Sequence, residues 1–163
     1  MRRRTVVFIT LGIVVGVLGL VATALFLLNF IDIDLRLSGP VSISTQWLEI
    51  SPSISMRPWK QNQYVSLDID GVNTNHLPLT EAFKSGKLQL ADGTAVTPEV
   101  ELIDENGRVY SLHVSMIDNK GIGYGKDCDP ECGFPWTKYR TVRIRADRVI
   151  HCSRVTWHCH TGK

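Results

Sequence analysis

The chain has 163 residues and a formal net charge of +2, and 44% of the residues are hydrophobic. This length suits one domain, and the composition excludes a disordered, collagen-like or low-complexity chain. Three arginines precede residue 5, and the rest of the chain carries 15 basic and 16 acidic residues. The globular part is therefore nearly neutral, which excludes the basic surface typical of nucleic-acid-binding proteins.

Residues 5–31 form an apolar run of 27 residues without a charge, which predicts a transmembrane helix over residues 5–30. Such a helix is roughly 40 Å long, and the hydrocarbon core of a bilayer is roughly 30 Å thick. The arginines of the basic head, residues 1–4, favour a cytoplasmic N-terminus. We therefore expect a single-pass signal anchor in the cell membrane and an extracytoplasmic domain over residues 31–163.

Two further interpretations concern this apolar segment. Ala22-Thr23-Ala24 offers a cleavage site for a signal peptide, but the apolar run continues past it and exceeds the usual core of about 7–15 residues. Gly12, Gly16 and Gly19 would share one helix face and allow close approach of a second helix. This spacing predicts helix self-association or docking on a partner helix, although glycine is also common in membrane helices generally.

The remaining chain alternates apolar and polar residues in short runs. Because side chains alternate between the two faces of a strand, this period predicts strands with one buried face. The predicted strands cover residues 31–37, 41–44, 64–70, 99–103, 109–116, 139–146 and 154–160. Asn106-Gly107 lies between two of these runs and predicts a hairpin turn.

Three other segments have different patterns. Thr80 suits the start of a short helix and Gly86 its end, and Ala82 and Phe83 would face the core. Residues 116–136 lack regular alternation and are predicted as a long loop. Residues 147–153 are predicted as a short kinked connection between the last two strands.

Many short strands without a strand–helix–strand rhythm predict an all-β antiparallel sandwich. The inward-facing positions are numerous enough to bury a substantial core. The predicted core residues are Val65, Leu67, Ile69, Leu102, Leu112, Val114, Val142, Ile144, Val155 and Trp157.

Residues 141–150, followed by Ser153-Arg154-Val155-Thr156-Trp157, resemble the closing strands of galactose-binding-like, carbohydrate-binding-module jelly-roll domains. The Asn106–Leu112 hairpin is compatible with this resemblance. It implies a jelly-roll fold that binds glycans, lipids or proteins. Because many functions share such folds, no binding residue is carried over from it.

The four cysteines, Cys128, Cys132, Cys152 and Cys159, all lie in the domain expected outside the cytoplasm, where disulfides form. A strand separates Cys152 from Cys159 by about 20 Å, and a disulfide needs Cα atoms within about 7 Å. Cys128 could instead pair with Cys132 across one turn, or this loop could pair with Cys159. The sequence leaves both arrangements open.

A metal site is the alternative use of the cysteines. His151-Cys152 and His158-Cys159-His160 offer thiolate and imidazole ligands. Strand alternation, however, places His158 and His160 on the face opposite Cys159. We therefore expect no metal and no other cofactor.

The C-terminal quarter is basic, and Arg143, Arg145, His158 and His160 are predicted to point outward from neighbouring strands. This predicts a patch for an anionic ligand or an acidic partner. The alternative is a solvated sheet face whose charges pair across strands.

Trp59 and Trp136 lie beside prolines in predicted loops. A tryptophan in a loop can stack on a sugar ring or anchor a protein partner. It can equally fill the end of a sandwich core. We include both residues in the hypothetical ligand or partner patch.

The chain lacks the Gly-x-Ser-x-Gly, His-Glu-x-x-His and phosphate-loop motifs, so no enzyme is predicted. Residues 121–125 are rich in glycine but precede no helix pattern, which indicates a flexible loop. Asp68 and Asp70 share one strand face, as a glycosidase pair might, but this spacing is more typical of solvent-facing carboxylates.

We expect a membrane-anchored extracytoplasmic binding or accessory module that contacts a membrane or envelope protein. A carbohydrate-binding module is the alternative, and a hydrolase is a distant third.

Overall fold

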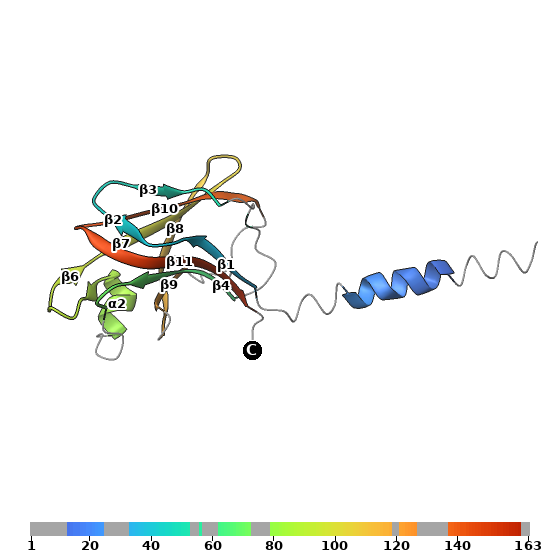
Figure 1. Ribbon diagram of the computed structural model, residues 1–163, viewed down its shortest axis with the longest axis horizontal. Helices are drawn as coiled ribbons and strands as arrows, with labels where there is room; N and C mark the ends of the chain where they lie inside the picture. Colours follow the sequence, from blue (N-terminus) through green and yellow to red (C-terminus); the bar gives the residue numbers. More distant parts are fainter. Residues whose placement is uncertain are drawn as a thin grey trace, which may run out of the picture. The chain divides into compact units, whose positions relative to one another are not determined.

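The chain divides into two units, Met1–Asp32 and Ile33–Lys163. The computed structural model describes residues 13–24, 33–52, 56, 62–72, 79–118, 121–126 and 137–160 (Figure 1). In the first unit, residues 13–24 are helical. No helix within the described ranges has the length and apolar character needed to cross a membrane. The remaining residues of the predicted 5–30 span lie outside the described part of the chain.

The second unit is built mainly of antiparallel strands. They are β1 (Ile33–Ser38), β2 (Val41–Ile43), β3 (Leu48–Ile50), β4 (Asn62–Ile69), β5 (Leu88–Gln89), β6 (Ala95–Val96), β7 (Pro98–Asp104), β8 (Val109–Asp118), β9 (Gly121–Gly125), β10 (Tyr139–Ala146) and β11 (Ile150–His160). The main sheet of the described strands has the order β1-β11-β4-β9-β8-β7-β10-β3, with β2 also paired to β11, and β5 pairs with β6. The prediction of an all-β antiparallel fold is confirmed.

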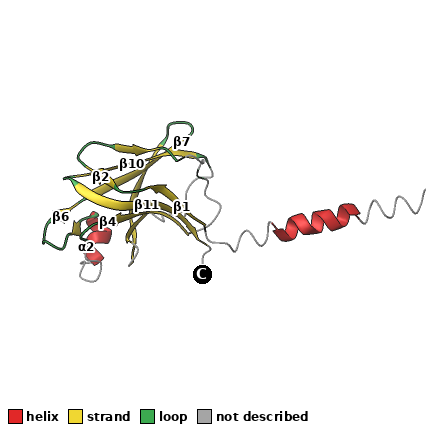
Figure 2. Cartoon of the chain, in the orientation of Figure 1, coloured by secondary structure: helices red, strands yellow, loops and turns green. Residues whose placement is uncertain are grey.

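The main sheet folds over itself and is nearly closed. The first half of β8 pairs with β7, and its second half pairs with β9. On the other side, the consecutive strands β2 and β3 pair with β11 and β10 respectively. Figure 2 shows β7 and β10 in one layer and β4 and β11 in the other. The two layers enclose one hydrophobic core.

All ten residues predicted to form the core are buried. Val65, Leu67, Val142, Ile144 and Val155 each have an exposed fraction of 0%. They come from strands of both layers, so the alternation along each strand correctly identified its inner face.

The predicted helix is present as α2 (Leu79–Ser85). Gly86 ends it with a φ of 68°, and its amide donates to the Ala82 carbonyl at 2.9 Å. Ala82 is buried as predicted, but Phe83 is 43% exposed, so the prediction that Phe83 faces the core is wrong. Consecutive helical residues lie about 100° apart around the axis, and the Ala82 side of α2 is the one that is buried.

The prediction that residues 121–125 form a flexible loop is also wrong. They form β9, which lies between β4 and β8 in the sheet. Ile122 and Tyr124 are buried in the core, and the glycines alternate with them on the opposite face. A Cβ atom on Gly123 would come within 2.8 Å of the Tyr64 ring. The glycines are therefore explained by close packing between strands.

The hairpin between β7 and β8 is present as predicted. The Asp104 carboxylate accepts hydrogen bonds from the amides of Asn106 at 2.8 Å and Arg108 at 2.9 Å, and from the Tyr110 hydroxyl at 3.2 Å. Burial raises the pKa of Asp104, but these hydrogen bonds outweigh it and hold the pKa below its ordinary value of 3.8.

This lowered pKa predicts that Asp104 stabilises the fold above about pH 3.8 and that its contribution is lost as the pH falls further. We expect Asp104→Asn to lower the melting temperature at neutral pH, and the difference from the wild type to shrink towards about pH 3. Thermal unfolding followed by circular dichroism across this pH range measures the effect. Tyr110→Phe, which removes one of the three hydrogen bonds, should show a smaller version. A difference that stays constant with pH would contradict the assignment.

Candidate functional site

The two predicted arginines lie together on the outer face of β10. Arg145 donates to Glu99 at 2.7 and 3.0 Å, and Arg143 forms an ion pair with Glu101. Both guanidinium groups also lie over the Trp47 ring. The central guanidinium carbon is 4.6 Å from the ring centre for Arg143 and 4.5 Å for Arg145. The charges on this face are thus paired across strands, which was the alternative interpretation of the basic segment.

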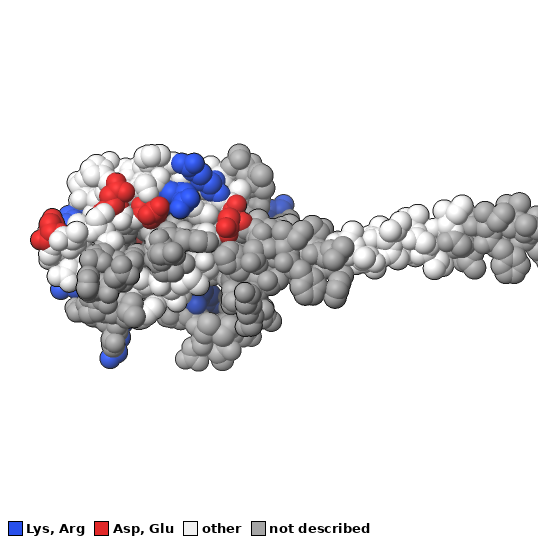
Figure 3. Space-filling model, turned by 60° about the horizontal axis from the view of Figure 1, so that its bottom comes forward, with Lys and Arg blue, Asp and Glu red and all other residues white. Residues whose placement is uncertain are grey.

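His158 lies in the other layer, so the predicted patch is not one continuous face. The prediction assumed that β10 and β11 are neighbours, and this is wrong. β10 pairs with β3 and β7, whereas β11 pairs with β1, β2 and β4, because residues 147–149 carry the chain from one layer to the other. Figure 3 shows basic and acidic side chains intermixed on the face it displays. The side chain of His160, and both Trp59 and Trp136, lie outside the described part.

His158 is the centre of a chain of hydrogen bonds across three adjacent strands. Its Nδ1 atom lies 2.6 Å from Asp34 Oδ1 on β1, and its Nε2 atom lies 2.8 Å from Ser66 Oγ on β4. Strand alternation places all three side chains on the face of the sheet opposite the core. Ser66 and His158 are nevertheless only 7% and 6% exposed.

The imidazole of His158 is held in place by its neighbours. The Tyr64 ring stacks on it with ring centres 4.6 Å apart and an interplanar angle of 19°. Thr156, which is 7% exposed, stands directly opposite Ser66 in the β4–β11 ladder. A serine, a histidine and a carboxylate in hydrogen-bonding sequence form an arrangement that can activate the serine hydroxyl.

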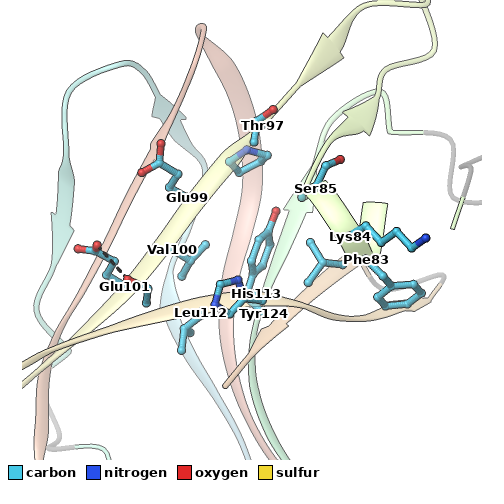
Figure 4. A pocket seen from close by; sticks show the side chains of 14 residues that line it. Phe83, Lys84, Ser85, Thr97, Glu99, Val100, Glu101, Leu112, His113 and Tyr124 are labelled. Carbon is cyan, nitrogen blue, oxygen red and sulfur yellow. Dashed lines mark hydrogen bonds between the residues drawn. The ribbon is translucent and has the colours of Figure 1, made fainter. Parts of the chain in front are cut away.

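A pocket of about 230 Å³ lies between α2 and the strands β7, β8 and β9 (Figure 4). Its inner part is apolar and includes Val100, Leu112 and Val114. Figure 4 shows Phe83 and Lys84 at the α2 side, while the Glu99 and Glu101 side chains extend away from the pocket. The pocket therefore combines an apolar interior with a polar rim.

The Tyr124 hydroxyl is directed into this pocket. Tyr124 is 1% exposed, and its hydroxyl has no hydrogen-bond partner among the described residues. Burial raises the pKa of Tyr124, with a further contribution from Cys152, so the hydroxyl keeps its proton and can donate. An unsatisfied buried hydroxyl costs about 1–3 kcal/mol, which a hydrogen bond donated to a bound group would offset.

Cys152 and Cys159 are buried in the core as free thiols. No disulfide joins these two cysteines in the described part of the chain, and a pairing of Cys159 with the 128–132 loop stays a prediction. Burial raises the pKa of Cys152 to about 11, which disfavours the reactive thiolate. Cys128 and Cys132 lie outside the described residues, so their local pairing stays a prediction. Within the described ranges, no three His, Cys, Asp or Glu side chains are arranged to hold a metal ion.

Asp34, Ser66 and Tyr124 were not predicted as site residues. Alternation indicated that Asp34 and Ser66 point away from the core, but it could not place them beside His158. The signal that was missed for Tyr124 is the alternation within Gly121–Gly125, which the three glycines obscured.

No protein-family model, curated protein or solved structure matches the chain. The resemblance of the closing strands to galactose-binding-like domains therefore stays a prediction.

Proposed function

We propose that the protein is a binding or accessory module held at the extracytoplasmic surface of the cell membrane, where it contacts a membrane or envelope protein. Membrane anchoring is supported by the run of 27 uncharged residues and by the three arginines before it. The contact is assigned to the pocket at Tyr124. The predicted arginine face is less suited to it, since Arg143 and Arg145 already pair with glutamates.

The unpartnered Tyr124 hydroxyl is the observation that carries this proposal. Buried polar groups in proteins nearly always have a hydrogen-bond partner, so an exception at the wall of a pocket favours a site for a bound group. The hydroxyl can donate to a carbonyl, hydroxyl or amide oxygen. The apolar surroundings formed by Val100, Leu112 and Val114 disfavour a charged group at this depth.

The size of the pocket supports a single side chain of a partner protein as its occupant. Its volume of about 230 Å³ lies below the roughly 300–1,000 Å³ of typical small-molecule sites. Protein interfaces often depend on a few side chains that fill such pockets at their centre. An uncharged side chain with one hydrogen-bonding atom fits both the volume and the chemistry.

A carbohydrate ligand is the second candidate, and the position of Phe83 favours it. Phe83 is 43% exposed and lies at one wall of the pocket, where the face of a sugar ring could pack against its side chain. The donating hydroxyl of Tyr124 would then bind a sugar oxygen.

The test is Tyr124→Phe in the full-length protein, combined with cross-linking in cells and purification in mild detergent. We expect a stoichiometric partner with the wild type and about tenfold weaker association with the variant, since one buried hydrogen bond is lost. The variant should be as stable as the wild type or slightly more stable, because it removes an unpartnered buried hydroxyl. Tyr110→Phe is the matched control and should lower stability without weakening association.

If Tyr124→Phe and the wild type bind the partner protein equally well, the pocket is not part of the interface. Titration with N-acetylglucosamine or galactose, followed by NMR, separates the second candidate from the first. Shifts confined to the pocket residues, in the absence of any stoichiometric protein partner, would favour the carbohydrate ligand.

A further inference from the structure

The Asp34–His158–Ser66 cluster lies on the opposite face of the sheet from the core and takes no part in the pocket. We propose that Ser66 is a nucleophile that hydrolyses small carboxylic esters, with His158 as its general base and Asp34 as the group that orients the imidazole. This activity goes beyond the proposed binding function, and neither depends on the other.

The hydrogen bonds give each ring nitrogen of His158 a definite role. The Asp34 carboxylate only accepts hydrogen bonds when ionised, so Nδ1 donates to it over 2.6 Å. In a neutral imidazole, Nε2 then has no proton and accepts from the Ser66 hydroxyl over 2.8 Å. Both distances lie within the range for a nucleophile, its base and the group that orients the base.

The cluster is also pre-organised. Each of the three residues comes from a different strand, and the strands are joined by continuous ladders, with Asp34 paired to His158 and Ser66 paired to Thr156. The stacked Tyr64 ring fixes the plane of the imidazole. Side chains held by sheet and stacking need little reorganisation when a substrate binds, which favours reaction.

Thr156 supplies a polar group beside the reacting atom. Residues directly opposite each other in an antiparallel ladder have Cβ atoms about 4.5–5.5 Å apart, and Thr156 stands opposite Ser66 on the same face. Its hydroxyl can turn towards a carbonyl oxygen of an acyl group held at Ser66 Oγ. We assign it the role of stabilising the negative charge that develops on that oxygen.

The reaction follows from these roles. His158 Nε2 takes the proton of Ser66 Oγ as this oxygen bonds to the acyl carbon, and the carbonyl electron pair moves onto oxygen. When the carbonyl re-forms, the ester C–O bond breaks and the leaving alkoxide takes the proton from Nε2. Water then attacks the acyl-serine with His158 again as base, and the proton returns to Ser66 Oγ. The net reaction converts an ester and water into a carboxylic acid and an alcohol.

The burial of Ser66 limits the class of substrate. Ser66 is 7% exposed, so we expect a short acyl group to reach its hydroxyl more readily than a peptide or a long chain. Esters are favoured over amides because an alkoxide leaves more readily than an amine anion and needs less assistance. We therefore assign short-chain carboxylic esters, such as acetates.

The same sheet contains a natural comparison. Ser42 Oγ lies 3.1 Å from His151 Nδ1, and both residues are exposed. No carboxylate within the described part of the chain is hydrogen bonded to His151. Ser42 is more accessible than Ser66 but lacks the orienting carboxylate. A serine-directed reagent whose reaction depended on access alone would therefore modify Ser42 rather than Ser66.

The experiment treats the full-length protein in detergent with a small fluorophosphonate, locates the modified serine by peptide mass spectrometry, and measures p-nitrophenyl acetate hydrolysis in parallel. We expect modification at Ser66 and none at Ser42, with loss of hydrolysis in proportion to modification. Ser66→Ala should abolish both signals, and Ser42→Ala should change neither. His158→Gln should slow hydrolysis at least about 100-fold and Asp34→Asn at least about tenfold.

The result with the wild-type protein decides the question even where a variant unfolds. Folded protein in which Ser66 stays unmodified would overturn the proposal, and so would equal modification of Ser42 and Ser66. Thermal unfolding of each variant shows whether it is folded at the assay temperature. A folded Asp34→Asn protein with unchanged hydrolysis would remove the orienting role of the carboxylate and, with it, the proposed mechanism.

Discussion

Replacing Gly121 with alanine is expected to lower the free energy of unfolding by about 3 kcal/mol or more. Two independent effects combine at this position. Its φ of 134° is a conformation that L-residues rarely adopt, and a Cβ atom would lie 2.5 Å from the Leu67 carbonyl oxygen and 3.3 Å from Asp68 Cα. Because these are backbone atoms of the neighbouring strand β4, the clash can only be relieved by separating the strands. Urea unfolding of the wild type and the variant measures the difference.

Gly93→Ala is the matched control for this prediction. Gly93 also has a positive φ, at 81°, but nothing lies within 4 Å of the Cβ position. Only the conformational cost of about 1 kcal/mol is expected there. If both variants lost the same stability, the close approach of β9 to β4 would not be the cause.

Tyr139→Ala is expected to destabilise the domain by about 4 kcal/mol, because it removes a large aromatic side chain from the core. Tyr139 is 0% exposed, and its ring centre lies 5.6 Å from that of Tyr110 and 5.9 Å from that of Trp157. These contacts join β10 and β8 to β11 in the other layer, so the substitution removes packing from both layers of the core. Thermal and urea unfolding give the free-energy difference.

The comparison variant is Phe83→Ala, which also removes an aromatic ring. Since Phe83 is 43% exposed, its loss should cost less than about 1 kcal/mol. The two substitutions therefore compare Phe83, which the sequence predicted to face the core, with Tyr139, which the structure shows in the core. A similar loss of stability in both would show that the Phe83 ring is buried in solution.

The strands, their inner faces and the hairpin turn could be predicted because each depends on local pattern. Val65, Leu67 and Ile69 alternate with polar residues, and this alternation alone identifies the buried face of β4. β9 was missed because glycines replace the polar residues that mark the outer face of the other strands. Its outer face has only glycines, whose role is to admit the Tyr64 ring and neighbouring backbone, and such close packing has no signal in the chain itself.

The candidate sites depended more on tertiary structure. The sequence indicated that Arg143, Arg145 and His158 point outward, and this was enough to suggest a patch. It could not show that the two arginines face glutamates of β7 while His158 lies in the other layer. The pocket at Tyr124 likewise requires α2 and three strands to meet, and no short motif encodes that meeting.

The all-β class, most strand positions, the ten predicted core residues and the short helix follow from local sequence pattern, because strand and helix periods are properties of consecutive residues. The strand order, and therefore which outward side chains meet, depends on long-range pairing that no local pattern encodes. Asp34 and His158 are 124 positions apart in the chain, yet they are hydrogen bonded because β1 and β11 are neighbours. Alternation tells which face a side chain occupies, but the choice of neighbouring strand depends on how the whole sheet closes over its core.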